Sequence, residues 1–134
     1  MKSRTKVLLL IILVLVVGAI SLFAAFQISN RETEQSAAEM TGGNPVRGRA
    51  LIREVGCGSC HTIPGISGAD SNVGPPLNKI AGRMFIGGVL ENNPDNMIRW
   101  LQNPPGVDEK TAMPNLGLSE ENSRDVAAYL YTLK

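Results

Sequence analysis

The sequence predicts an all-α domain with long Gly/Pro-rich loops, preceded by a single N-terminal transmembrane helix. Residues Val7–Phe26 are almost wholly apolar and carry no charge. Three later segments each begin at a polar residue suited to capping a helix, and no stretch of useful length alternates apolar and polar residues. The 14 Gly and 8 Pro predict long irregular connections between the helices.

The apolar stretch is long enough to cross a membrane. A helix of 20 residues, Val7–Phe26, spans ~30 Å, the thickness of a bilayer hydrocarbon core. Lys2, Arg4 and Lys6 precede it and should stay in the cytoplasm, so the rest of the chain is expected outside. A cleaved signal peptide ending near Ala19-Ile20-Ser21 is the alternative, and it places the domain on the same side. We favour an anchor because the apolar run continues past that point.

Three parts are expected: a cytoplasmic tip and anchor over 1–26, a tether over 27–43, and a folded domain over 44–134. The tether is rich in Glu, Ser, Ala and Gly and ends at Gly42-Gly43. Fully stretched, it would reach at most ~60 Å. Its first half is equally compatible with a helix that continues from the anchor.

Each expected helix of the domain has a start signal. Asn44 and Pro45 suit the cap and first position of a helix that ends at Gly56. Asn93-Pro94-Asp95 repeats this signal for a helix that ends at Asn103-Pro104-Pro105-Gly106. Ser119 begins the last helix, which places Val126, Leu130 and Leu133 on one face.

The charge of the exported part argues against nucleic-acid binding. Three of the thirteen basic residues lie among the first six, so ten basic and twelve acidic residues follow the anchor. No basic stripe is visible. A domain of roughly 90 residues with few aromatic residues has a small core, so a cofactor is expected to supply apolar bulk.

Cys57-Gly58-Ser59-Cys60-His61 is the main chemical signal. This C-x-x-C-H spacing is typical of c-type haem attachment, because each cysteine can add to one haem vinyl group while the following histidine ligates the iron. A redox-active disulfide usually needs a βαβ context, and a zinc site needs four ligands. The chain has only two Cys and one His, so a carboxylate would have to complete a zinc site.

From Asn44 to Lys134 the chain resembles the class I cytochromes c, and the anchor adds a similarity to membrane-attached bacterial cytochromes and to cytochrome domains associated with terminal oxidases. Four segments carry the resemblance: Gly48 to Val55, Gly74-Pro75-Pro76-Leu77, Asn103-Pro104 with Thr111-Ala112-Met113-Pro114, and Asp125 to Leu130. It implies the class I cytochrome c fold, in which the first and last helices cross, here with Gly48 and Tyr129 as the contact pair.

The resemblance also implies one haem c, bound covalently through Cys57 and Cys60, with His61 and Met113 as its two axial ligands. The Pro75 carbonyl would accept a bond from His61, and Leu77 would pack against the porphyrin. The remaining cofactor contacts it implies are Trp100 on the methionine side, and Arg83 and Thr111 near the propionates. Core packing explains Trp100 equally well, as a surface charge and a capping hydroxyl explain the other two.

Five methionines compete for the sixth position, and the residues alone favour core packing for Met97 and Met113. Met1 lies in the tip, Met40 in the tether, Met97 on a helix face, and Met84 in a loop where it is expected to pack. Only the resemblance singles out Met113.

The expected function is one-electron transfer in a membrane respiratory or related redox chain, without enzymatic activity. The alternative is a fixed subunit through which electrons enter a membrane oxidase or dehydrogenase. A small haem enzyme or gas sensor is a third hypothesis, which requires a weak Met113 bond. The expected location is the bacterial cytoplasmic membrane, with the domain on the periplasmic or outer side. The expected partners are redox proteins in or at that membrane, including a terminal oxidase and an upstream donor. Neither a nucleic acid nor a small-molecule substrate is expected.

Overall fold

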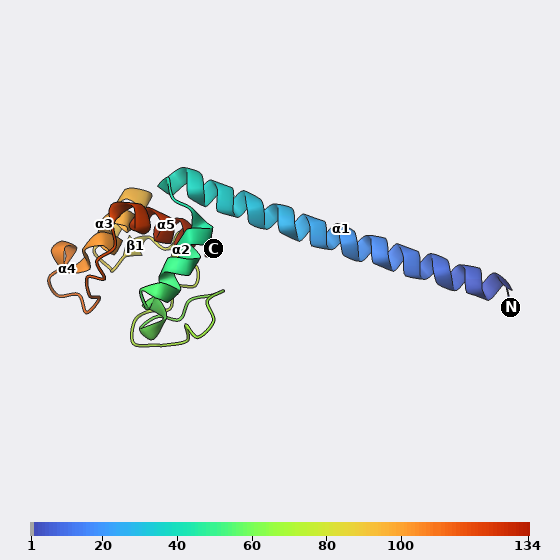
Figure 1. The fold of residues 1–134 in the computed structure, drawn as a ribbon, viewed down its shortest axis with the longest axis horizontal. Coiled ribbons are helices and arrows are strands. Elements are labelled where there is room, and N and C mark those ends of the chain that lie inside the picture. The colour runs from blue at the N-terminus through green and yellow to red at the C-terminus, as the bar shows by residue number, and fades with distance from the viewer. Residues whose placement is uncertain (1) are drawn as a thin grey trace. The chain divides into compact units, whose positions relative to one another are not determined.

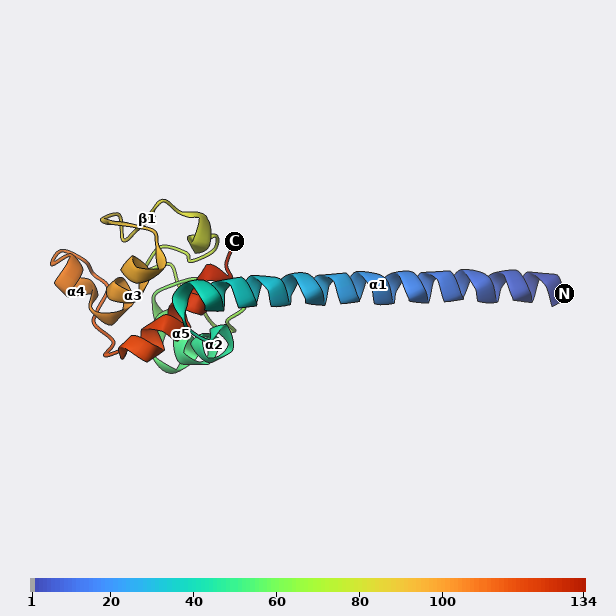
Figure 2. The same ribbon diagram turned by 90° about the horizontal axis from the view of Figure 1, so that it is seen from above.

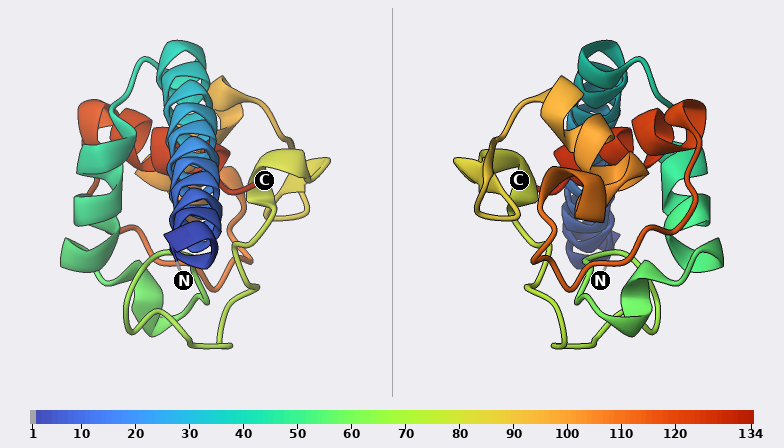
Figure 3. Two further views of the ribbon diagram at one scale, coloured as in Figure 1. Left: turned by 90° about the vertical axis from the view of Figure 1, so that its right-hand side faces the viewer. Right: turned by 90° about the vertical axis from the view of Figure 1, so that its left-hand side faces the viewer.

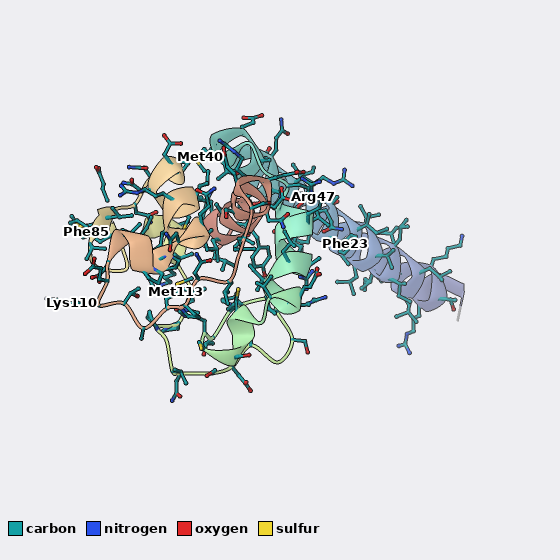
Figure 4. The ribbon with its side chains drawn as sticks, turned by 60° about the vertical axis from the view of Figure 1, so that its left-hand side comes forward. Phe23, Met40, Arg47, Phe85, Lys110 and Met113 are labelled. Carbon is teal, nitrogen blue, oxygen red and sulfur yellow. The ribbon has the colours of Figure 1, made fainter. Side chains whose placement is uncertain are left out.

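The computed structural model describes residues 2–134 and divides them into a unit that ends at Thr33 and a unit from Glu34 to Lys134. Helix α1 (Lys2–Thr41) contains a stretch long and apolar enough to span a membrane. None of that stretch is buried within the protein, and Figure 4 shows Phe23 projecting from it.

The segment expected as a tether is helical through Thr41, so only Gly42-Gly43 lies outside the helix. Ala37 and Thr41 are fully buried in the second unit, and Arg124 Nη1 donates to the Thr41 carbonyl at 3.0 Å. The sequence allowed a helix in the first half only. Ala, Glu and Ser suit a solvated loop as well as a helix, and burial of Ala37 and Thr41 is a tertiary effect.

The second unit contains four further helices, two 3₁₀ turns and one short hairpin. In chain order these are α2 (Pro45–Glu54), η1 (Cys57–Ser59), η2 (Ile80–Gly82), β1 (Phe85–Ile86), β2 (Leu90–Glu91), α3 (Pro94–Gln102), α4 (Pro104–Val107) and α5 (Glu120–Tyr131). The three expected capping residues, Asn44, Asn93 and Ser119, all accept backbone N–H bonds from the first turn of their helices. These helix starts are therefore confirmed.

The β1–β2 hairpin and α4 were not expected. Ile86 pairs with Leu90 and Phe85 with Glu91 in the antiparallel hairpin. Helix α4 begins at Pro104, immediately after α3 ends, and Asn103 caps it by accepting from Gly106 N. Both elements are too short for hydrophobic periodicity to reveal them.

The core of the second unit lies among α2, α3 and α5, where α5 contacts both of the other helices. Figures 1 and 2 show α2 beside α5, and Figures 2 and 3 show the hairpin on the opposite side of α3 and α5 from α2. The long loop from 62 to 79 connects the two sides (Figure 3). Ile52, Met97, Val126 and Ala127 are almost completely buried between these helices.

The crossing of α2 and α5 depends on Gly48. A Cβ atom at Gly48 would lie 1.9 Å from the Asp125 carbonyl oxygen and 3.0 Å from Val126 N. The nearest atoms are therefore α5 backbone, whereas an aromatic contact with Tyr129 was expected. The Tyr129 hydroxyl instead donates to the Pro64 carbonyl at 2.6 Å, which fastens the 62–79 loop to α5.

We expect Gly48→Ala to destabilise the protein by at least about 3 kcal/mol, since neither backbone can move away without separating the helices. Helix propensity alone predicts the opposite sign, because alanine is the better helix former. Urea unfolding of the purified protein measures the effect. Ala50→Gly on the exposed face of the same helix is the control, with an expected loss of about 1 kcal/mol. A Gly48→Ala variant as stable as the wild type would contradict the close helix approach.

An ion pair fixes the same crossing. Asp125 is buried, and its carboxylate accepts from Arg47 at 2.8 Å and from Asn44 N at 2.7 Å. The hydrogen bond with Asp125, and then that with Glu121, raises the pKa of Arg47 above its ordinary value. The beginning of α2 is thus joined to α5 by both backbone and side-chain contacts.

Candidate functional site

The C-x-x-C-H segment follows directly from the end of α2. Gly56 adopts a left-handed conformation with φ 78°, which ends the helix and starts η1. Cys60 N and His61 N both donate to the Cys57 carbonyl, at 3.2 and 3.0 Å. This turn places the two thiols and the imidazole within five residues of one compact bend.

Both thiols are free and half-buried. Burial raises the pKa of the Cys57 thiol, so it stays protonated at neutral pH. No three His, Cys, Asp or Glu side chains gather in the described part of the chain in a way that could hold a metal ion, so the zinc alternative finds no ligand set there. Two unpaired thiols remain available for covalent attachment.

The His61 ring is held by the Gly74-Pro75-Pro76-Leu77 segment. His61 Nδ1 lies 2.7 Å from the Pro75 carbonyl oxygen. Since a carbonyl oxygen can only accept, Nδ1 carries the proton and Nε2 keeps its lone pair for a metal. Gly74 N donates to Cys60 O at 2.7 Å and Leu77 N to Thr62 O at 2.8 Å, which aligns this segment with the attachment bend.

Gly74 leaves room for the ring. A Cβ atom there would lie 2.5 Å from Cε1 and 2.8 Å from Nδ1 of His61. We expect Gly74→Ala to displace the imidazole and to lower the stability of the protein by ~1–3 kcal/mol, measured by thermal or urea unfolding.

Gly82→Ala is the matched control, because a Cβ atom at Gly82 meets nothing within 4 Å. That variant should change stability by no more than ~1 kcal/mol. Equal losses in the two variants would show that the space beside His61 is not what Gly74 supplies.

Met113 lies on the loop between α4 and α5 and points into the second unit, whereas Phe85 and Lys110 lie at its edge (Figure 4). Trp100 Nε1 donates to Met113 Sδ at 3.1 Å, and Met113 N donates to Thr111 Oγ1 at 3.2 Å. Trp100 is itself buried, with 7% of its surface exposed. The Trp100 side chain therefore orients the thioether, and the Thr111 side chain holds the backbone of Met113.

The other methionines of the second unit lie elsewhere. Met97 is 2% exposed and belongs to the core, as expected. Met84 was expected to pack within its loop, but 78% of its surface is exposed, so that prediction is wrong. In the strand that follows Met84, Ile86 is buried and Phe85 is exposed, and Met84 itself lies before the first residue of that strand.

Several apolar side chains of the second unit, Cys57 and Met113 among them, pack on the core and remain partly exposed. The others include Leu77, Val55 and Leu90. Such half-covered apolar walls suit a flat apolar cofactor. The donor set of two thiols, an imidazole with a free Nε2 and a thioether has the chemistry that a covalently attached haem requires.

Arg83 and Thr111 make backbone contacts in this structure. The Arg83 guanidinium donates to the carbonyls of Pro76 and Asn78, the latter at 3.0 Å. Thr111 holds the Met113 backbone, which is the capping role that the sequence left open.

Three residues of this region were missed by the sequence analysis. Asn92 donates to the carbonyls of Ile80 and Arg83, and Tyr131 donates to Asn92. Gly87, with φ 58°, brings the hairpin so close to Trp100 that a Cβ atom would lie 2.5 Å from its ring. Asn-Asn-Pro and Gly-Gly mark turns, but no sequence signal shows what a turn packs against.

Comparison with known proteins identifies the family of the chain. The Cytochrome c family profile matches residues 45–134. The chain is also similar to the cytochrome c oxidase subunit 2 of Alkalihalophilus pseudofirmus, at 34% identity over 89 residues. That alignment covers 66% of this chain and 25% of the relative, so the chain spans about a quarter of that protein's length. The chain belongs to the cytochrome c family, whose members bind haem c and transfer electrons through it.

Proposed function

We propose that this protein is a one-electron carrier of a membrane redox chain, using a single haem c attached through Cys57 and Cys60. The observation that carries the proposal is the donor set that one folded unit holds in place: two free thiols, the Pro75-bound imidazole and the Trp100-bound thioether of Met113. When bound, the haem would supply an iron that gains or loses one electron.

His61 and Met113 are proposed as the axial ligands. The Pro75 carbonyl fixes the imidazole tautomer and raises the basicity of Nε2. A thioether ligand favours ferrous over ferric iron, so Met113 would give the carrier a high potential. The partly exposed apolar walls would exclude water from the ligands, and Leu77 is proposed to contact the porphyrin.

With His61 and Met113 both holding the iron, no position would remain for a substrate. This supports electron transfer over oxygen or peroxide chemistry. Trp100 is proposed to orient the thioether, and Arg83 and Thr111 to line the propionate side.

The proposed location is the bacterial cytoplasmic membrane, with the tip and anchor over 1–26 and the haem domain on the periplasmic or outer side. The length of the apolar stretch supports a membrane span, and the basic residues before it support this orientation. The domain is proposed to begin at Asn44, although the last turns of α1 add Ala37 and Thr41 to its core.

A terminal oxidase and an upstream donor are the proposed partners. The similarity to an oxidase subunit 2 also supports a second candidate, a fixed subunit through which electrons enter a membrane oxidase or dehydrogenase. Extraction in mild detergent separates the two: a carrier should purify alone, whereas a fixed subunit should purify in a stoichiometric complex.

The direct test uses the full chain purified from a host competent for cytochrome maturation. A denaturing gel should retain haem stain on the protein band, and intact mass should show one haem per chain. A redox titration should follow a one-electron curve. A colourless protein with free or mutually bridged thiols would overturn the proposal.

A further inference from the structure

The carboxamide of Asn92 joins the turn around η2 to the end of α5. Its Nδ2 donates to the Ile80 carbonyl at 2.8 Å and to the Arg83 carbonyl at 2.8 Å. Its Oδ1 accepts from the Tyr131 hydroxyl at 2.8 Å. One side chain therefore connects η2, the residue after it and the end of α5.

The orientation of this carboxamide is fixed by its partners. Both carbonyl oxygens can only accept, so Nδ2 must face them and Oδ1 must face Tyr131. Burial raises the pKa of Tyr131 to about 12, so its hydroxyl is protonated and donates at neutral pH. Asn92 is half-buried, and these three bonds use both of its N–H groups and its oxygen.

Arg83 extends these contacts toward the site. Asn92 holds its carbonyl, and Arg83 N donates to Ile80 O at 3.2 Å. With its backbone fixed in this way, the Arg83 side chain donates to the carbonyls of Pro76 and Asn78.

Pro75 and Pro76 limit the ways in which hydrogen bonds can hold this segment. Neither has an N–H group, so Pro75 and Pro76 can be held by hydrogen bonds only through their carbonyls. The Pro75 carbonyl accepts from His61, and the Pro76 carbonyl accepts from Arg83. Hydrogen bonds thus connect Tyr131, Asn92, Arg83 and Pro76. The residue before Pro76 carries the carbonyl that accepts from His61.

We propose that Asn92 is a positioning residue for His61. Through Arg83 it sets the place of the Pro75 carbonyl and hence the strength of the hydrogen bond from His61 Nδ1. The inference rests on the proposed function, in which His61 Nε2 is an iron ligand. A bond of this kind fixes the ring orientation and the basicity of the ligating nitrogen.

His61 is the only histidine in the chain, so ¹⁵N-histidine labelling gives a signal from one ring alone. The experiment measures solvent exchange of the Nδ1 proton in the reduced, haem-loaded full chain in detergent micelles. We expect Asn92→Ala to accelerate this exchange roughly five- to tenfold, as for the loss of one hydrogen bond. Arg83→Met should accelerate it similarly, because it keeps the aliphatic stem but removes the Nη2 group that donates to both carbonyls.

Ser119→Ala is the control, since it removes the α5 cap without touching this set of contacts. Should Asn92→Ala not accumulate, Asn92→Asp keeps the side-chain volume and the acceptor for Tyr131 while removing both N–H donors. Exchange in the Asn92 variants equal to that in Ser119→Ala would overturn the proposal, and so would a normal rate in Arg83→Met. A His61 signal typical of free imidazole in the wild type would instead overturn the proposed function itself.

Discussion

Replacing Cys57 and Cys60 together with serine should abolish covalently bound haem completely. A serine hydroxyl is a far weaker nucleophile than a thiol and forms no thioether. The measurement is a denaturing gel stained for haem, with the protein quantified on the same lane. The stain should be absent from the double variant, whereas either single variant keeps one thiol and should retain part of it.

Ser59→Ala is the matched control for that experiment. Ser59 lies between the two cysteines and is exposed, so it should not be required for attachment. Ser59→Ala should stain like the wild type. Full staining of the double variant would mean that the haem is held by other residues, and the proposed site would be wrong.

Met113→Ala should leave the haem attached but lower its reduction potential. We expect the potential to fall by about 0.2 V, which lies within the range of roughly 0.8 V over which axial ligands set haem potentials. The physical reason is that the thioether favours ferrous iron and that its removal admits water to the open position. A potentiometric titration measures the potential, and carbon monoxide added to the reduced protein measures access to the iron.

Met84→Ala is the control for the loss of a thioether, because Met84 is 78% exposed. It should keep the wild-type potential and remain unreactive toward carbon monoxide. If Met113→Ala also kept both properties, Met113 would not be the ligand. A wild type that already bound carbon monoxide rapidly would favour the gas-sensor hypothesis.

The helix starts and the attachment motif could be predicted because their causes are local. Asn44, Asn93 and Ser119 accept bonds from N–H groups two or three residues away, so each signal and its effect lie in one short segment. The spacing of Cys57, Cys60 and His61 is likewise a property of five consecutive residues.

The helical end of α1, the hairpin and the Met84 side chain could not be predicted in the same way. Ala37 and Thr41 are buried in the second unit, and Arg124 of α5 donates to the Thr41 carbonyl from 83 positions away. Whether Phe85 or Ile86 faces the core depends on the register of a two-residue ladder, which periodicity cannot detect, and Met84 lies just before that ladder.

The sequence by itself determined the apolar stretch, the three capped helix starts and the C-x-x-C-H spacing, because each follows from the chemistry of neighbouring residues. Only the tertiary structure decided how those residues are held. It placed Pro75 against His61, Trp100 against Met113, and Asn92 between Arg83 and Tyr131. Hydrogen bonds have short range and strict direction, so contacts between distant segments exist only once the helices and loops have packed.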